Sequence, residues 1–182
     1  MRKFNAILAH TIITLFLLHI IIGSLQLTGL VPGGNVIMKI GSWLLIAAVG
    51  AHTVIGIKLT ADTLAAMKKS GTSYFRENKL FWIRRISGFA VMFFIAAHII
   101  LFMGHGSGSA FRLNLFDVPQ LIMSILLVLS VLLHIVTNIR PMMLGSGIRG
   151  AKEFIADMAV IFSVLLLVSG IAFVVYFVRW LA

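Results

Sequence analysis

The chain contains no cysteine, only three prolines and only five acidic residues among its 182. Without cysteine it forms no disulfide, holds no iron–sulfur cluster of its own and attaches no haem through a Cys-x-x-Cys-His motif. Charged residues make up 11% of the sequence, against roughly 25% in an average soluble domain. So little charge indicates a chain that lies in a membrane rather than in water.

Long apolar runs fill the sequence, and hydrophobic residues make up 60% of it. A helix needs about 20 apolar residues to cross a bilayer, where its backbone must satisfy its own hydrogen bonds. We therefore predict a single all-α domain over residues 1–182, an integral membrane bundle of five transmembrane helices. Pro32, Pro119 and Pro141 are expected at helix ends or in loops. The helices are expected at about 5–27, 36–58, 83–104, 118–139 and 155–179.

The basic residues are unevenly divided between the two ends of these helices. Twelve of the 15 fall on the side of the N-terminus and three on the other side. Cytoplasmic loops carry an excess of Lys and Arg, so we expect the N-terminus in the cytoplasm and the C-terminus outside. No compact basic domain exists to bind nucleic acid. The twelve are Arg2, Lys3, Lys58, Lys68, Lys69, Arg76, Lys79, Arg84, Arg85, Arg140, Arg149 and Lys152, and the three are Lys39, Arg112 and Arg179.

The longest connection expected in the cytoplasm runs from Thr60 to Lys79. Its first part, TADTLAAMKKSG, can continue the second helix as an amphipathic end that stops at Gly71. With the connection around 145–152 it forms the main polar surface, where a soluble partner would have to dock.

Four of the six histidines lie inside apolar segments, one in each of the first four helices. An ionisable side chain in the hydrocarbon of a membrane is costly and marks a functional site by default. His52 and His134 each lie six residues before a basic residue, Lys58 and Arg140, and therefore roughly 9 Å inside the cytoplasmic boundary. The segments HTVIGIK and HIVTNIR that begin at these histidines also share a pattern, which favours a duplicated two-helix unit.

The other two histidines are predicted to lie nearer the outer face. His19 follows Lys3 by 16 residues and His98 follows Arg85 by 13, which places both imidazoles roughly 20–24 Å from the cytoplasmic end. Two pairs at two depths suit two haem irons, each bound by imidazoles from two helices. A zinc site would need four ligands at one depth. A proton relay would need acidic residues, which these four helix interiors lack.

Small residues lie one helical turn from three of the histidines, where they would let a flat macrocycle approach the backbone. Helix packing in membranes also selects small residues, so both interpretations stay open. His98 instead has Phe94 and Phe102 one turn away, suited to a porphyrin edge or to lipid. Ser130 or a backbone carbonyl is a candidate acceptor for the second imidazole N–H. The small residues are Gly23, Ala48, Gly56, Ser130 and Asn138.

Residues 82–98, WIRRISGFAVMFFIAAH, resemble the R-x-S-G…H helix of the membrane anchors of succinate dehydrogenase and fumarate reductase. The matching residues are Arg85, Ser87, Gly88 and His98. The five-helix layout, with histidines on helices one to four, resembles the single-subunit dihaem branch of that family. The resemblance implies two b haems, the outer on His19 and His98 and the inner on His52 and His134, the same pairs that the depths indicate.

The resemblance also implies a non-catalytic electron-transfer subunit in the bacterial cytoplasmic (inner) membrane. Its expected partners are a flavoprotein subunit and an iron–sulfur subunit on the cytoplasmic face, with a homodimer of the complex as one possible assembly. Electrons would pass between the clusters and menaquinone or another quinone. Lys58, Arg84, Arg85 and Arg140 are candidates to neutralise haem propionates, besides their role in topology. Ser87 is a candidate to hydrogen-bond a propionate or a quinone, or to cap the helix backbone.

The pattern departs from some relatives at Leu132, where they carry a glutamate two residues before the fourth-helix histidine. The outer side offers only Asp117 and Gln26 in place of the acidic residue that those relatives place near a quinone. His10, near the cytoplasmic face, is a candidate for the vicinity of a quinone or an interfacial polar residue. His105 opens an outer loop and is expected to be solvated.

Three alternatives remain at the level of sequence. Cytochrome b subunits of other quinone-linked oxidoreductases would have a similar composition and histidine count. A haem-free anchor that only docks soluble subunits would tolerate loss of the histidines. A transporter would normally show charged or proline-broken helix interiors, which these segments lack.

Overall fold

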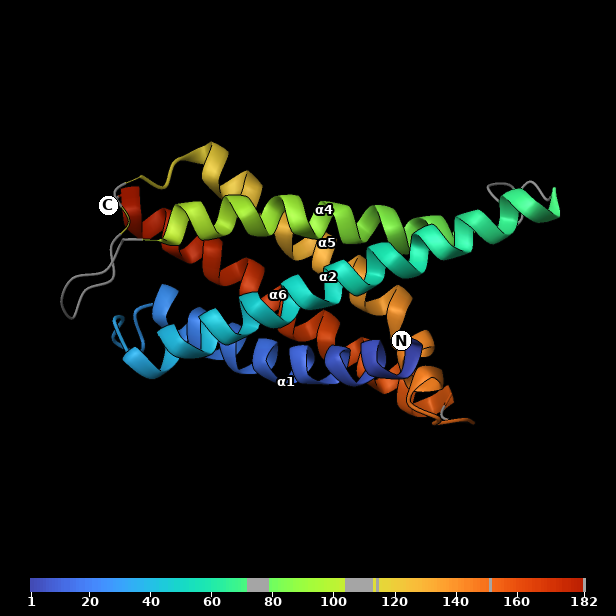
Figure 1. The fold of residues 1–182 in the computed structure, drawn as a ribbon. Coiled ribbons are helices and arrows are strands. Elements are labelled where there is room, and N and C mark those ends of the chain that lie inside the picture. Colours follow the sequence, from blue (N-terminus) through green and yellow to red (C-terminus); the bar gives the residue numbers. More distant parts are fainter. Residues whose placement is uncertain (72–78, 104–112, 114, 151, 182) are drawn as a thin grey trace.

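The computed structural model describes residues 1–71, 79–103, 113, 115–150 and 152–181. These residues form five long α-helices (Figure 1), and all five are long and apolar enough to cross a membrane. The prediction of an all-helical chain with five membrane-spanning helices is confirmed to that extent, while the orientation of the termini stays a prediction. The helices are α1 Arg2–Leu27, α2 Val36–Ser70, α4 Lys79–Phe102, α5 Val118–Gly145 and α6 Lys152–Leu181.

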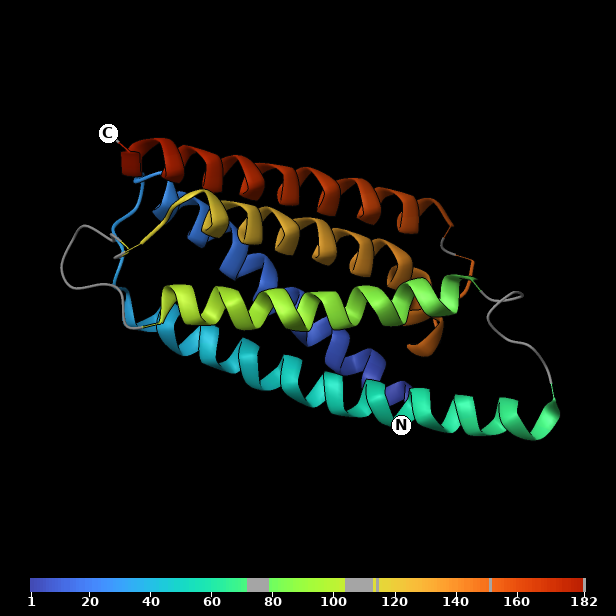
Figure 2. The same cartoon turned by 90° about the horizontal axis from the view of Figure 1, so that it is seen from above.

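Helix α2 continues well past the expected membrane boundary at Lys58. It runs to Ser70 and ends where Gly71 adopts a left-handed conformation with φ of +67°, as glycine does at many helix C-termini. Lys68 and Lys69 lie in the last turn, where their positive charges stabilise the negative end of the helix dipole. The extension is confirmed, and it projects beyond the other helices in Figures 1 and 2.

Helix α5 does not end near residue 139, and the prediction that Pro141 lies at a helix end is wrong. The helix runs through Pro141 to Gly145. Proline has no N–H and leaves the carbonyl four residues earlier, that of Thr137, without its helical partner. The Arg84 Nε on α4 donates to this carbonyl at 2.8 Å. A side chain from the neighbouring helix therefore replaces the missing bond, which is what a proline inside a membrane helix requires.

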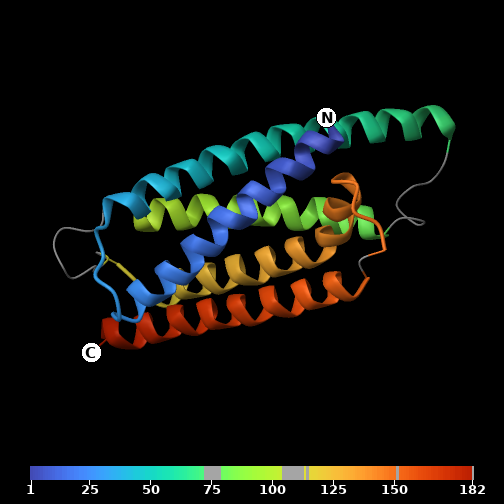
Figure 3. The same ribbon diagram turned by 90° about the horizontal axis from the view of Figure 1, so that it is seen from below.

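Two pairs of neighbouring helices pack closely, α1 with α2 and α4 with α5, and α6 joins α5 to α1. Figures 2 and 3 show α1 running obliquely to the other helices, behind α4 in Figure 2 and in front of it in Figure 3. Two clusters of apolar side chains hold α1, α5 and α6 together. The first cluster is built on Ile139, Met143 and Phe162. The second cluster is built on Leu27, Leu113, Phe116, Ala172, Phe173 and Tyr176.

Polar contacts fasten the end of the bundle at which α1 and α6 end. The Arg179 guanidinium on α6 donates to the Thr28 carbonyl just after α1. Next to it Gly29 has φ of +77°, and a side chain at this position would overlap the Arg179 guanidinium. The Tyr176 hydroxyl accepts from the Leu113 N–H at 2.9 Å. These bonds satisfy polar groups at a helix end and in a connection that packing alone would leave unpaired.

Arg84→Ala should destabilise the protein, because the Thr137 carbonyl would lose the donor that replaces its helical N–H, at a cost of about 1–3 kcal/mol. Pro141→Ala restores a helical N–H for that carbonyl. We therefore expect Arg84→Ala to cost markedly less in the Pro141→Ala background, measured as thermal unfolding in detergent. Arg140→Ala is the matched control and should show no coupling to Pro141→Ala. Equal costs of Arg84→Ala in both backgrounds would contradict the assignment.

Candidate functional site

The two outer histidines face each other from α1 and α4. The ring centroids of His19 and His98 are 6.2 Å apart, with an interplanar angle of 78°. A direct N–H···N hydrogen bond would bring the ring centres to roughly 5 Å, and no such bond joins them among the described residues. Two imidazoles bound to one metal ion from opposite sides, with bonds of about 2.0–2.1 Å, have ring centres roughly 6.3 Å apart. The observed separation matches the second arrangement.

The outer imidazoles have different neighbours. His19 Nδ1 lies 3.2 Å from the Ser42 Oγ on α2, and Ser42 in turn donates to the Met38 carbonyl at 2.9 Å. His98 packs between aromatic rings, with Phe102 at 4.6 Å and Phe173 at 6.3 Å between centroids. The His98 Nδ1 is buried without a hydrogen-bond partner among the described residues. Phe102 thus contacts the histidine itself, a position that the sequence analysis did not consider for it.

The inner histidine on α5 is held by the motif on α4 that the sequence singled out. The buried Ser87 Oγ lies 3.2 Å from His134 Nδ1 and donates to the Arg84 carbonyl, also at 3.2 Å. A Cβ at Gly88 would lie 3.3 Å from the His134 Cε1. Glycine here lets the imidazole lie directly on the α4 backbone. The Ser87 hydroxyl and the Arg84 backbone are therefore the hydrogen-bonding neighbours of the His134 imidazole. A backbone carbonyl was one of the two acceptors that the sequence suggested, whereas no described hydrogen bond joins His134 to Ser130, the other one.

His52, the other inner histidine, lies on a helix that has no buried residue. Its Nδ1 is nevertheless buried without a partner in the described part of the chain. His52 and His134 lie within electrostatic range of each other and of Arg85, but their rings are not in contact. Beside His52, the Thr53 hydroxyl contacts the Met92 Sδ on α4 at 3.2 Å. The contact brings α2 to α4 near the level of the inner pair.

The helices that carry each pair are separated, although their neighbours pack closely. Neither α1 with α4 nor α2 with α5 packs backbone to backbone along its length in the described structure. A side chain added at Gly23 or Gly56, one turn from His19 and His52, would meet nothing within 4 Å. Space therefore exists beside an imidazole of each pair, as a macrocycle between the helices would require.

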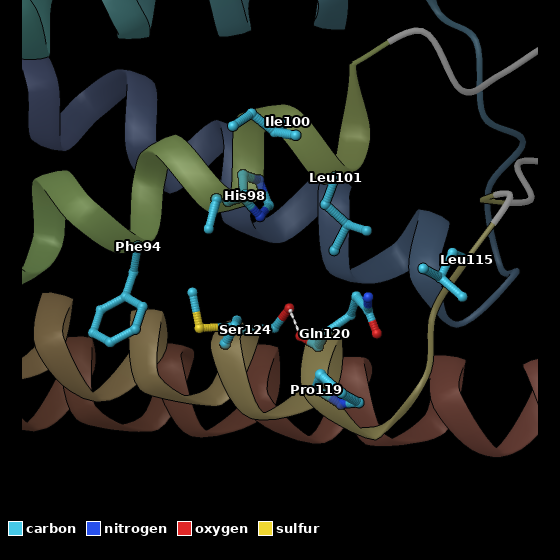
Figure 4. A pocket seen from close by; sticks show the side chains of 10 residues that line it. Phe94, His98, Ile100, Leu101, Leu115, Pro119, Gln120 and Ser124 are labelled. Carbon is cyan, nitrogen blue, oxygen red and sulfur yellow. Dashed lines mark hydrogen bonds between the residues drawn. The ribbon is translucent and has the colours of Figure 1, made fainter.

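A cavity of about 450 Å³ adjoins His98 between α4 and the start of α5 (Figure 4). Its lining is apolar apart from His98, Gln120 and Ser124, and Figure 4 shows the α4 side chains facing those of α5 across it. Ser124 is buried and donates to the Gln120 carbonyl at 2.9 Å. A mostly apolar cavity with a few polar groups is typical of sites for small organic ligands.

The donor chemistry fits bis-imidazole ligation. In the described structure the Nε2 atoms of His19, His52, His98 and His134 form no hydrogen bond. No group of three or more His, Cys, Asp or Glu side chains comes together among the described residues. A haem iron takes only two protein ligands, so pairs are sufficient. The role of the four histidines as iron ligands stays a prediction.

The predicted propionate partners differ in position. Arg85 lies nearest the inner pair, with its guanidinium carbon 4.8 Å from the centre of the Phe81 ring. Arg84 is engaged through Nε with the Thr137 carbonyl. Lys58 and Arg140 are exposed. Arg85 is therefore the cation that the structure brings closest to the candidate site.

The remaining histidines are not brought to either pair. His10 lies on α1, more than two turns before His19, and its Nδ1 donates to the Ala6 carbonyl at 2.7 Å. Its relation to a quinone stays a prediction. His105 lies outside the described residues.

Sequence reasoning missed Ser42 as a partner of His19. It is one of two hydroxyl side chains in the expected second helix, the other being Thr53. The same depth argument that paired the histidines would have matched it to His19, because Ser42 lies three residues inside Lys39 at the outer end.

No family model, no curated protein and no solved structure matches this chain. The resemblance of the third helix to the succinate dehydrogenase and fumarate reductase anchors therefore rests on its residues alone.

Gly88→Ala should disturb the inner pair selectively. The added Cβ would lie 3.3 Å from the His134 ring, so the imidazole must move away from α4 and from Ser87. We expect no gain in thermal stability from this substitution, although glycine to alanine inside a helix normally contributes about 0.5–1 kcal/mol. Gly50→Ala is the control, since its Cβ meets nothing within 4 Å. A similar gain in melting temperature for both variants would refute the close contact.

Proposed function

We propose that this protein is the membrane-anchor cytochrome b subunit of a quinone-linked oxidoreductase of the succinate/fumarate type. It would carry electrons between a membrane quinone and a flavoprotein and iron–sulfur reductase on the cytoplasmic face. The observation that carries the proposal is the facing arrangement of His19 and His98, whose ring separation suits one metal ion. The proposal extends the same ligation to His52 and His134.

The chain's own residues would hold two b haems without a covalent bond, since it has no cysteine. His19 and His98 would bind the outer haem and His52 and His134 the inner one, and Arg85, which lies within electrostatic range of both inner histidines, would be the cation nearest to a propionate of the inner haem. A bound haem supplies a one-electron couple whose potential depends on its ligands, their hydrogen bonds and their burial. The separation of α1 from α4 and of α2 from α5 supports this placement.

The cavity beside His98 supports a quinone as the membrane partner. An apolar lining suits a quinone ring and tail, and Gln120 and Ser124 supply polar groups near the ring. The cavity adjoins an outer ligand, so menaquinone or another quinone in it would lie next to the outer pair. This position replaces the vicinity of His10 as the favoured quinone site.

The basic end of the bundle supports docking of soluble subunits. The projecting turns of α2 between Lys58 and Ser70 lie at the same end as the N-terminus and the start of α4. Positive charge concentrates there, which agrees with a cytoplasmic location. We therefore propose that the protein lies in a bacterial inner membrane and that the reductase subunits dock on this end of it.

A haem-free docking anchor is the second candidate. The observation in its favour is that His19 and His134 already have serine partners, as buried structural histidines do. The two candidates differ in their cofactor content.

Purified full-length protein should contain two haems per polypeptide by the pyridine haemochrome assay, with paired b-type bands in reduced-minus-oxidised spectra. His98→Ala and His134→Ala should each lower the haem content, because each removes one ligand of a bis-imidazole pair. His10→Ala is the control and should retain both haems, since its imidazole bonds only to its own helix. Protein that carries no haem after expression with excess haem would exclude the proposed function and favour the docking anchor.

A further inference from the structure

We infer that Ser42 and Ser87 are positioning residues, each of which orients one imidazole of one pair and sets the redox potential of one haem. This inference rests on the proposed function. It adds that the two sites are built alike, each with one ligand supported by a serine from a neighbouring helix and one ligand without such support.

Counting hydrogens gives the direction of the bond at the outer pair. The Ser42 hydroxyl has one proton, which goes to the Met38 carbonyl at 2.9 Å. Its oxygen therefore accepts from the His19 Nδ1–H at 3.2 Å. A neutral imidazole protonated at Nδ1 has its lone pair on Nε2. The chain from carbonyl to serine to imidazole thus leaves His19 in the tautomer that binds a metal through Nε2.

The inner pair repeats this chain on different helices. Ser87 donates to the Arg84 carbonyl and its oxygen faces the His134 Nδ1, both at 3.2 Å. The His134 imidazole also hydrogen-bonds the Arg84 backbone, and because a carbonyl only accepts, this bond too requires a proton on the imidazole nitrogen. Ser87 is only 2% exposed, so water does not compete for its hydroxyl. Because Gly88 has no side chain, the imidazole lies directly against the α4 backbone. Tautomer and ring orientation are therefore fixed together.

The opposite ligands lack this support. The Nδ1 atoms of His98 and His52 are buried, and in the described residues neither has an acceptor. A hydrogen bond from Nδ1–H makes an imidazole more basic and a stronger donor to a metal. Stronger donation stabilises ferric over ferrous iron and lowers the potential. Each serine therefore lowers the potential of its own haem and leaves the other unaffected.

The test is a redox titration of the full-length haem-loaded protein, with Ser42→Ala and Ser87→Ala compared with wild type. Loss of an outer-shell partner typically changes metal affinity by 10-fold or more. We expect each substitution to weaken ferric relative to ferrous binding about tenfold, which raises one midpoint potential by about 59 mV for a one-electron couple. Ser42→Ala should raise the midpoint potential of one haem, and Ser87→Ala should raise that of the other. Electron paramagnetic resonance of the ferric protein should change for the same haem, as the ring orientation changes.

Ser163→Ala is the matched control. Ser163 is half-buried on α6 and donates to the Ala159 carbonyl at 2.7 Å, so it makes the same bond to its own helix without touching a histidine. It should leave both potentials unchanged. Ser42→Thr and Ser87→Thr keep the hydroxyl and should keep both potentials at the wild-type values.

Several outcomes overturn the inference. Two bound haems with unmoved potentials in Ser42→Ala and Ser87→Ala would show that the serines serve only helix structure, while the proposed function would stand. If Ser42→Ala or Ser87→Ala binds no haem, the threonine variant at the same position decides. A threonine variant with two haems at wild-type potentials supports the role of the hydroxyl. A threonine variant that loses as much haem as the alanine variant refutes it. Absence of haem from the wild-type protein would instead exclude the proposed function.

Discussion

The structure depends on one constraint: a polar group inside the membrane needs a partner, because lipid offers none. The constraint acts on side chains at His19 and His134, whose Nδ1 atoms are hydrogen-bonded by serines from neighbouring helices. Each bond fixes the rotation of two helices relative to each other, α1 on α2 and α5 on α4. The polar residues thus determine which faces of largely apolar helices meet, which apolar surface alone does not specify.

The same constraint acts on the backbone at Pro141. The carbonyl that proline frees is that of Thr137, and Arg84 fills the place of the absent N–H. Arg84 lies one turn before Gly88, against which His134 packs, so one short stretch of α4 supports both the proline-containing turn and the imidazole. The stretch of α4 from Arg84 to Gly88, which includes the R-x-S-G motif, is therefore built into the packing of α5, whatever further role its arginines have toward a cofactor.

The sequence predicted the number of helices well, because a bilayer demands long apolar runs that are visible without structure. It also grouped the histidines by depth, since the rise per residue is constant along a helix. It did not predict the continuation of α5 through Pro141, because the compensating donor, Arg84, lies 53 residues away in sequence. The choice of Ser87 over Ser130 depends on how two helices are rotated against each other, and the apolar pattern of a membrane helix carries little of that information.

Helix α6 carries no histidine, yet among the described residues it supplies more buried side chains than any other helix and holds the histidine-bearing helices α1 and α5 together. It packs against α5 along its length and is bonded to the end of α1 through Arg179. Helix α2 packs along its length only against α1 in the described structure. Protein packing therefore positions His134 firmly and His52 far less so. A group bound between these two imidazoles would complete the attachment of α2, so binding at the inner site and the position of the projecting α2 end would be coupled.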